Sequence, residues 1–326
     1  MNSTPEAPPR LSVIIPVRNA RGQLERCLKS LSRQRVKGEG YEVIVVDDGS
    51  SDGSAEVVSR WNARLIRQDG KGAGAARNRG VREASGEVIL FLDADCEAAP
   101  QWIQKLVEPI GKDSISGTVG RFTSEQKHWV ARLIQIEFEG RYDRMKGFDR
   151  VDFVNTATCG FKRQVLREHL FDEGFEKLED IELSFRLARN GGRIIYVPEA
   201  TVRHVHPESV WAFMRRKFRY GKVAPALYRR YPGKALSDTG TPHYRRLQLA
   251  LIGLALLALP LAPPQGLFLW LASMPFSLPL VARAFRQSPG LGLISPFFFL
   301  AGNTAFVVGS GWGLLSSWRT RRSRTL

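Results

Sequence analysis

The chain has 326 residues, 43% of them hydrophobic, and a formal net charge of +16, a size that can bury a full core. Residues 1–210 carry 32 basic and 31 acidic side chains, whereas residues 211–326 carry 16 and 1. The first part has the balance of an ordinary soluble domain, and the second is predicted to meet an anionic surface. Its long apolar runs exclude nucleic acid from the expected partners and favour an anionic membrane.

The cysteines and the N-terminus bear on the compartment. Cys27, Cys96 and Cys159 are odd in number, far apart and without the spacing of a metal site, which indicates a reducing compartment. Residues 1–10 have no apolar core, so they are not a signal peptide and are expected to be disordered. The folded part that follows is expected to stay in the cytoplasm.

Continuously apolar strands alternate with helical segments in the first hundred residues. Such an alternation predicts a parallel sheet that is covered by helices on both faces. Ligands of these sheets bind beyond the carboxyl ends of the strands, where Asp47-Asp48 and Asp93-Ala94-Asp95 lie. The predicted strands are 11–17, 43–46, 65–66 and 88–92, and helices are predicted at 24–31, at 54–61 and after the glycine-rich run 70–78.

The middle of the chain has a mixed pattern. Residues 156–161 are a run of mostly small side chains, and residues 194–197 predict a further strand. Helices are predicted at 126–145, 178–188 and 210–231, the last of them basic and rich in aromatic residues.

Three apolar stretches, 247–262, 266–282 and 291–315, fill the C-terminal part. The first two are short for a span of about 20 residues, and the third is long enough. Three full spans would put the cluster Arg319–Arg324 outside, against the preference for positive charge inside. Either one segment is re-entrant or interfacial, or this preference fails here. The alternative is a buried helical hairpin in a soluble protein.

Asp93-Ala94-Asp95 is the most informative motif, because it follows the apolar run 88–92 directly. Two carboxylates at the edge of a sheet are costly unless a cation or a ribose meets them there. The alternative is an acidic turn at the end of a strand.

Five motifs in order resemble the family 2 glycosyltransferases, over roughly residues 11–222. They are Ser12–Asn19 (SVIIPVRN), Val45–Ser54 (VVDDGSSDGS), Ala76-Arg77-Asn78, Asp93-Ala94-Asp95 and Glu179-Asp180. The resemblance implies an α/β protein of the GT-A fold, a Rossmann-like mixed, mostly parallel sheet with helices on both faces, plus C-terminal membrane helices. The domains expected are a disordered 1–10, a catalytic domain at 11–209, a basic amphipathic segment at 210–246, transmembrane or re-entrant helices at 247–318 and a basic tail at 319–326.

The resemblance also implies residues for the nucleotide sugar. Pro16 and Arg18 would frame the nucleotide pocket, and Asp48 would accept hydrogen bonds from base or ribose, while Asp47 anchors its own turn. Arg77 would meet the nucleotide or the diphosphate, or else pair with Asp48 or Asp93 for structure alone. Asp93, with Ala94 beside it, would face ribose and sugar.

A divalent cation, Mg²⁺ or Mn²⁺, is the expected cofactor. The resemblance gives Asp95 to the metal, with Asp93 next to it. Two carboxylates are an incomplete set, so we expect His204, or His206 as second choice, to supply a third ligand. Mn²⁺ tolerates imidazole better than Mg²⁺ does.

The resemblance implies that Asp180 is the catalytic base and that Glu179 orients the acceptor or the base, although both could also stabilise the start of a helix. The predicted acceptor and diphosphate contacts are Thr158, Cys159, Gly160, Arg216 and Arg219, and the alternative for the two arginines is a solvated face at the bilayer. Processive members of the family carry Gln-x-x-Arg-Trp, which this chain lacks, so the addition of a single sugar is expected.

The predicted activity is therefore inverting transfer of one sugar from a nucleotide-diphosphate sugar, foremost a UDP-sugar. The expected acceptor is a hydroxyl or phosphate of a lipid-linked or envelope-polysaccharide saccharide, at the cytoplasmic face of the inner (cell) membrane. The alternatives are a metal-dependent nucleotidyltransferase, which would need neither Glu179-Asp180 nor a membrane segment, and a catalytically silent nucleotide-binding scaffold.

Overall fold

The computed structural model describes residues 11–36 and 40–322, in two compact units that we describe separately. The sheet unit comprises residues 11–125 and 148–205, and the helical unit comprises residues 126–147 and 206–322. The predicted disorder of residues 1–10 and the end of the basic tail, 323–326, lie outside the described residues.

One eight-stranded sheet, in the order β3-β2-β1-β4-β7-β6-β8-β5, forms the sheet unit. Four of the seven strand pairs are parallel and three, β4–β7, β6–β7 and β5–β8, are antiparallel. This confirms the predicted mixed, mostly parallel sheet. The strands are β1 Leu11–Val17, β2 Tyr41–Asp47, β3 Arg64–Arg67, β4 Val88–Leu92, β5 Cys96–Ala98, β6 Gly117–Thr123, β7 Thr158–Lys162 and β8 Ile194–His204.

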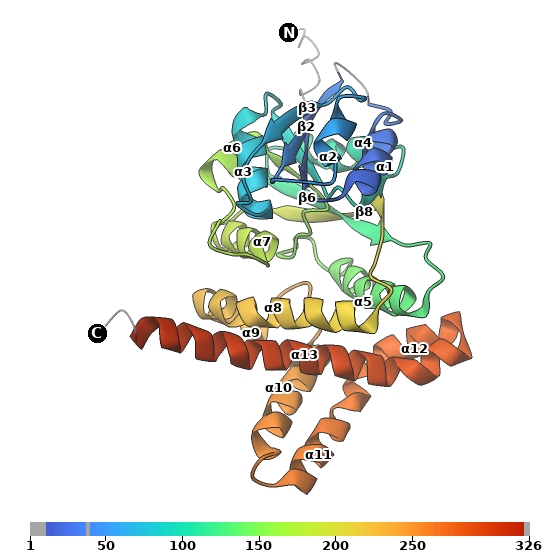
Figure 1. The fold of residues 1–326 in the computed structure, drawn as a ribbon, viewed down its shortest axis with the longest axis vertical. Coiled ribbons are helices and arrows are strands. Elements are labelled where there is room, and N and C mark those ends of the chain that lie inside the picture. Colours follow the sequence, from blue (N-terminus) through green and yellow to red (C-terminus); the bar gives the residue numbers. More distant parts are fainter. Residues whose placement is uncertain (1–10, 37–39, 323–326) are drawn as a thin grey trace. The chain divides into compact units, whose positions relative to one another are not determined.

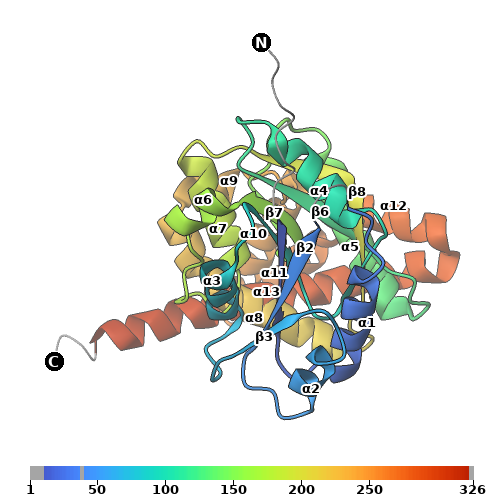
Figure 2. The same cartoon turned by 90° about the horizontal axis from the view of Figure 1, so that it is seen from above.

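Helices cover this sheet on both faces, with α1 and α2 on one and α3 and α6 on the other (Figure 2). Helix α1 is typical, since its buried residues Leu24, Cys27, Leu28 and Leu31 recur every three or four positions. The helices of this unit are α1 Arg21–Leu31, α2 Ser54–Val58, α3 Ala73–Glu83, α4 Trp102–Val107, η1 Glu108–Gly111, α6 Arg163–Glu168 and α7 Glu179–Arg189.

The chain changes direction across the sheet between β1 and β4. It runs outward from β1 through β2 to β3 and then returns to β4, which pairs with β1 in parallel. The loops after Val17 and Leu92 therefore open at a topological switch point, where sheets of this type bind their ligands. All five residues of β4 are buried, which explains the apolar run before Asp93.

The helical unit packs α5, α8, α12 and α13 around one apolar core (Figure 1). Residues 126–147, which the sequence placed inside a catalytic domain of 11–209, pack with this unit instead. Its elements are α5 Trp129–Met145, α8 Val210–Arg230, α9 Pro232–Leu236, α10 His243–Ala258, α11 Pro263–Ala272, η2 Met274–Ser277, α12 Leu278–Gln287 and α13 Pro289–Arg322.

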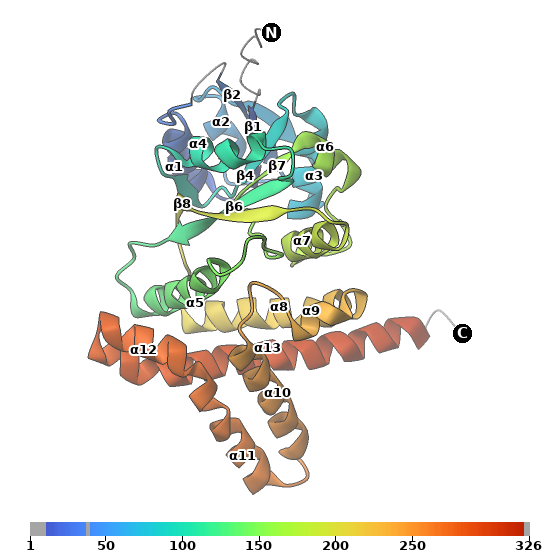
Figure 3. The same ribbon diagram turned by 180° about the vertical axis from the view of Figure 1, so that it is seen from behind.

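Glycines bring α8 and α13 into close backbone contact. A Cβ atom added to Gly221 would overlap the carbonyl of Phe306, and one added to Gly309 would overlap that of Phe218. Phe213 stacks on Phe298 with 4.4 Å between the ring centroids. The two helices therefore lie side by side (Figures 1 and 3).

Two stretches of the helical unit, 263–287 and 289–316, are long and apolar enough to cross a membrane. Helices α10 and α11 form a hairpin that projects from the layer of α8 and α13 (Figure 3). No charged residue occurs between Arg246 and Arg283.

Candidate functional site

A buried arginine joins the acidic residues of two distant elements. Arg77, 4% exposed, lies 2.9 Å from Asp93 Oδ1 and 2.7 Å from Glu179 Oε1 through its two terminal nitrogens. Asp93 follows β4, and Glu179 is the first residue of α7. The end of the strand and the start of the helix thus meet at one guanidinium.

Helix α3 places Arg77 at this point. Small buried residues on the same helix, Ala75 and Ala76, let it pack closely. The guanidinium also lies 5.7 Å from the centre of the Phe171 ring. Burial alone would lower the pKa of Arg77, but Asp93 and Glu179 raise it above its ordinary value, so the cation is permanent. Of the two structural pairings expected for Arg77, the one with Asp93 is present.

Asp180 lies at the N-terminus of α7, beside Glu179. Burial and the charge of Glu179 raise the pKa of the Asp180 carboxyl to about 7. Leu178, which precedes the Glu179-Asp180 pair, has φ 65°, a left-handed conformation that residues other than glycine rarely adopt. This strained turn starts the helix at the acidic pair, and strain of this kind concentrates at functional sites.

Asp95, Cys96 and His204 form the cluster that could hold a metal ion, with ligand atoms within 4.8 Å of one another. His204 Nε2 lies 3.5 Å from Asp95 Oδ2. The antiparallel pairing of β5 with β8 sets Cys96 opposite His204, and Phe122 stacks on the imidazole at 4.8 Å. The hydrogen bond from His204 lowers the pKa of Asp95 despite burial, which keeps this carboxylate ionised.

Asp95 and His204 provide part of the ligand set that a divalent cation needs. A carboxylate oxygen and an imidazole suit Mn²⁺, with the remaining positions left to a ligand. Burial raises the pKa of the Cys96 thiol, and its Sγ–H donates to Asp95 Oδ1. Burial also raises the pKa of Asp93, whose Oδ1 pairs with Arg77.

His206, the second choice for the metal, makes other contacts. It belongs to the helical unit, where its Nε2 lies 2.8 Å from Gln135 Oε1 and its ring stacks on Phe138. These contacts favour His204 as the histidine of the site.

The turn after β2 is tied to the glycine-rich loop. Asp47 Oδ1 accepts a hydrogen bond from Ser50 N, as expected of an anchoring turn. Asp48, 4% exposed, accepts from Gln68 Nε2 and from the backbone N–H groups of Lys71 and Gly72, at 2.7–2.9 Å. Loop residues therefore occupy Asp48 in this structure, and its contact with the nucleotide stays a prediction.

The other residues predicted for the nucleotide lie nearby. Pro16 is near the end of β1, opposite Val46. Arg18 has a side chain that is 58% exposed, 3.9 Å from Asp48 Oδ2. Ala94, between the two aspartates, is buried.

The predicted acceptor residues divide into two groups. Thr158, Cys159 and Gly160 lie in the central strand β7. Thr158 accepts a hydrogen bond from Trp102, and the side chains of Thr158 and Cys159 are fully buried. They face the core, and this arrangement lends no support to a direct acceptor contact. Arg216 and Arg219 lie on α8 of the helical unit, Arg219 exposed and Arg216 half-buried. Their roles stay predictions.

Four contributors to the site were not singled out from the sequence. Gln68 binds Asp48, Phe171 lies against Arg77, Phe122 stacks on His204, and Cys96 donates to Asp95. Only Cys96 had a signal in the sequence, its place directly after Asp95.

The comparison with known families agrees with this arrangement. A family model described as "Glycosyl transferase family 2" matches residues 12–175, half of the chain. The chain belongs to glycosyl transferase family 2.

Relatives in this family cover the chain to different extents. It is 38% identical to glycosyltransferase AglE of Haloferax volcanii over 34% of its own length and 40% of that protein. It is 27% identical to an N-acetylglucosaminyltransferase of Sinorhizobium fredii over 82% of its length and 72% of that protein. The chain spans less than half of some of these relatives, including AglE.

A solved structure shares the fold. The mannosyltransferase PcManGT of Pyrobaculum calidifontis, solved with GDP-Man and Mn²⁺, has a TM-score of 0.65 and 20% identity. The match covers 94% of this chain and 87% of that one. At this identity the similarity establishes the GT-A-like fold, and with it the predicted fold class.

Proposed function

We propose that this glycosyltransferase moves a single sugar, with inversion, from a nucleotide-diphosphate sugar to an acceptor held at a membrane. A UDP-sugar is the donor that we propose to test first. The observation that carries the proposal is the double ion pair of Arg77, which brings Asp93 of the donor motif and Glu179, next to Asp180, to one place.

Asp180 is the residue that would take the proton of the acceptor hydroxyl. Inversion at the anomeric carbon is one in-line displacement, in which the acceptor oxygen forms a bond as the diphosphate leaves. A pKa of about 7 suits this role, because about half of the carboxyl groups are then ionised at neutral pH and the carboxylate is a stronger base than an ordinary one. Glu179 is held by Arg77, so it positions Asp180 through its charge and its place on α7.

Asp95 and His204 would hold a divalent cation, which would stabilise the negative charge of the departing diphosphate. Support comes from the spacing of these groups and from the ionised state of Asp95. The Pyrobaculum structure, which contains Mn²⁺ and GDP-Man, favours Mn²⁺ for testing first. Asp93 would remain with Arg77 and the sugar.

Attachment to a membrane is supported by the apolar surface of the helical unit; we propose that this is the inner membrane, with the sheet unit in the cytoplasm. Leu257 is 73% exposed, Leu261 89% and Phe268 70%, all on the hairpin of α10 and α11. Patches of this kind mark membrane or protein interfaces. A lipid-linked acceptor suits an enzyme that is held in this way.

The packing of α8 on α13 favours a re-entrant hairpin over three spans. If α13 crossed the bilayer, α8 would have to follow it with the cations Arg215, Arg219 and Lys222, each costing roughly 2.5–3.5 kcal/mol or more at the centre. Helices α8 and α13 would therefore lie in the interface, while α10 and α11 dip into the hydrocarbon and return.

The activity is tested by donor turnover in purified membranes with Mn²⁺. We expect Asp95→Ala and Asp180→Asn to lower turnover by at least about 10²-fold, and the exposed control Asp113→Ala to leave it unchanged. Release of nucleoside diphosphate identifies sugar transfer, whereas release of pyrophosphate would identify a nucleotidyltransferase. Full turnover by either site variant would reject the assignment.

The topology is tested by cysteine labelling of intact cells and of lysed cells. The native cysteines are buried, so Leu261→Cys and Ser288→Cys can be followed in the natural background. A re-entrant hairpin leaves both unlabelled by an impermeant maleimide from outside, and Ser288→Cys is labelled after lysis. If residues 263–287 crossed the bilayer, one of the two would be labelled in intact cells.

A further inference from the structure

Asn78 is a buried polar side chain of the Ala-Arg-Asn motif that has no part in the proposed reaction so far. It lies on α3, directly after Arg77, and is 1% exposed. Asparagine is unfavourable in the interior of a helix, and a buried amide is costly unless its hydrogen bonds are made. The partners of this amide therefore show what the side chain does.

The amide of Asn78 binds both polar groups of one peptide residue, Phe171. Its Oδ1 accepts the N–H of Phe171 at 2.8 Å, and its Nδ2 donates to the carbonyl of Phe171 at 2.9 Å. The same Nδ2 donates to Glu173 Oε1 at 2.8 Å. One acceptor and two donor positions are thus used, and Phe171 is held as a neighbouring antiparallel strand would hold it.

These bonds fix the start of the segment 169–178, which joins α6 to α7 and is neither helix nor strand. Phe171 is buried, and its ring meets Phe91 of β4 edge to face, with 5.3 Å between the centroids. Arg186 of α7 donates to the carbonyl of Leu170 at 2.6 Å. The start of the segment is therefore attached to α3, to the sheet and to α7.

Two adjacent residues of α3 hold the two ends of this segment. Asn78 binds it at Phe171, and Arg77 binds Glu179, where α7 begins. Helices α3, α6 and α7 lie next to one another on this side of the sheet unit (Figures 1 and 2). A segment that is fixed at both ends loses conformations that a loop attached at one end can adopt. Asp180, next to Glu179, is therefore held by both attachments.

We propose that Asn78 is a positioning residue for sugar transfer, which sets the place of Asp180 by fixing the segment before α7. This inference rests on the proposed function, in which Asp180 takes the proton of the acceptor hydroxyl. Displacement of a reacting group by about 1 Å can cost roughly 10²-fold in rate. The role requires no contact between Asn78 and the donor or the acceptor.

The first test follows the segment itself, by hydrogen–deuterium exchange of the full chain in detergent. Asn78→Ala removes the bonds to Phe171 and Glu173, so we expect exchange in residues 169–182 to rise at least about tenfold while β1 and β4 stay protected. Val81→Ala, which shortens another buried side chain of α3, is the matched control and should change this exchange less than about twofold. Unchanged exchange of the segment in Asn78→Ala would overturn the proposal.

The second test separates positioning from a purely structural role, by release of UDP from the UDP-sugar that wild-type membranes consume with Mn²⁺. We expect Asn78→Ala to lower kcat at least about tenfold and to change the donor KM less than about threefold, because it displaces Asp180 and leaves the nucleotide residues in place. Val81→Ala, assayed below its unfolding temperature, should keep the wild-type kcat. Equal losses of kcat in the two variants would assign Asn78 to stability alone and refute the proposal.

An isosteric variant covers the case in which Asn78→Ala does not fold. Asn78→Asp keeps the acceptor for the N–H of Phe171 and loses both donors, so exchange of the segment and kcat should change in the same directions. A wild-type kcat in Asn78→Asp, with the segment loosened, would show that its position does not matter for transfer.

The failure of this inference can be told from the failure of the proposed function. If the wild-type chain transfers sugar and Asn78→Ala loosens the segment without loss of kcat, the positioning role is wrong and the proposed function stands. If the wild-type chain binds UDP with Mn²⁺ but turns over no donor, the proposed function fails, and this inference fails with it.

Discussion

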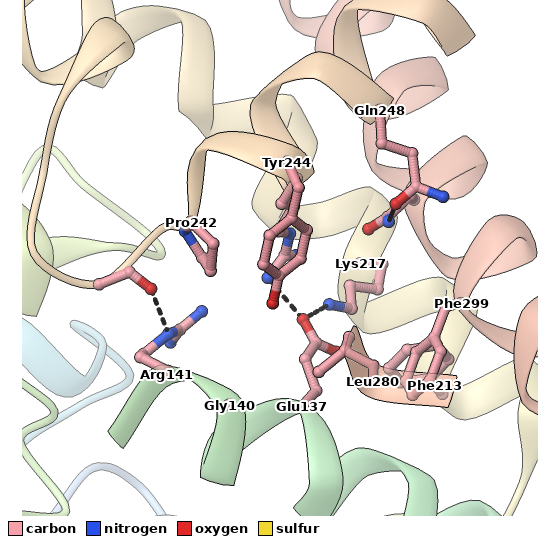
Figure 4. A pocket seen from close by; sticks show the side chains of 13 residues that line it. Glu137, Gly140, Arg141, Phe213, Lys217, Pro242, Tyr244, Gln248, Leu280 and Phe299 are labelled. Atoms are coloured by element: carbon pink, nitrogen blue, oxygen red, sulfur yellow. Dashed lines mark hydrogen bonds and ion pairs between the residues drawn. The ribbon is translucent and has the colours of Figure 1, made fainter. Parts of the chain in front are cut away.

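The two units contain clusters of opposite charge built on the same plan. In the sheet unit Asp93 and Glu179 pair with one buried arginine, Arg77, and in the helical unit Lys217 and Arg245 pair with one carboxylate, Glu137 (Figure 4). Each cluster shifts the pKa of one member to about 7, upward for Asp180 and downward for Lys217. In both, burial penalises the charge that is in excess.

The comparison concerns how an excess of buried charge shifts a pKa. Excess negative charge favours the protonated form of a carboxyl, and excess positive charge favours the neutral form of a lysine. A cluster that served structure alone would be better balanced, because uncompensated buried charge costs several kcal/mol. The predictions below test whether each cluster is held together by its single counter-ion.

The largest effect is expected for Arg77→Met. Removal of this guanidinium leaves Asp93 and Glu179 without their buried partner and should lower the free energy of unfolding by roughly 3–5 kcal/mol. Equilibrium unfolding in urea measures this change in the free energy of unfolding. Arg79→Met, on the same helix with a side chain that is 52% exposed, should stay within about 0.5 kcal/mol. Similar effects of the two changes would mean that Arg77 does not hold the cluster.

The paired helices that support the basic cluster are tested by two glycines of α13. Gly309→Ala would press a methyl group against the carbonyl of Phe218 and should destabilise the chain by about 1–3 kcal/mol. Gly311→Ala meets nothing within 4 Å and should stabilise it by about 0.5–1 kcal/mol. Thermal unfolding in detergent compares them, and a harmless Gly309→Ala would show that α8 and α13 are not closely packed.

The smallest effect concerns Asp180 and pH. A raised pKa in the folded state means that the folded chain holds a proton that the unfolded chain has lost, so stability falls as pH rises towards 7. Asp180→Asn removes this penalty and should stabilise the chain at pH 8, but not at pH 4. Over the same range, wild-type turnover should rise with ionisation of the carboxylate. An equal stability difference at both pH values would contradict the raised pKa.

Local sequence patterns were sufficient to predict most helices and strands of the sheet unit. Apolar runs located β1, β2 and β4, and the acidic motifs fell at strand ends as expected. The family followed from five motifs in order, three of which include the end of a strand or follow it directly, while Ala76-Arg77-Asn78 lies in α3 and Glu179-Asp180 begins α7. The arrangement of Asp47 in its own turn followed from the short reach of its side chain.

Contacts between residues that are far apart in the sequence could not be predicted from local patterns. The predicted strand 194–197 continues past Pro198 to His204, and only its pairing with β5 brings His204 to Asp95. Proline usually ends such a prediction, because it removes a ladder hydrogen bond. The partner of Glu137 lies 80 residues further along the chain, at a distance where periodicity carries no information.

The hydrogen bonds of Asp48 have one more consequence. They end on the N–H groups of Lys71 and Gly72, and Gly72 immediately precedes α3, the helix that carries Arg77. Helix α3 thus connects the loop that binds Asp48 with the guanidinium that pairs with Glu179 at the start of α7. If a ligand displaced the N–H groups of Lys71 and Gly72 from Asp48, the start of α3 would lose two of its anchoring hydrogen bonds, at the end of the helix that carries Arg77.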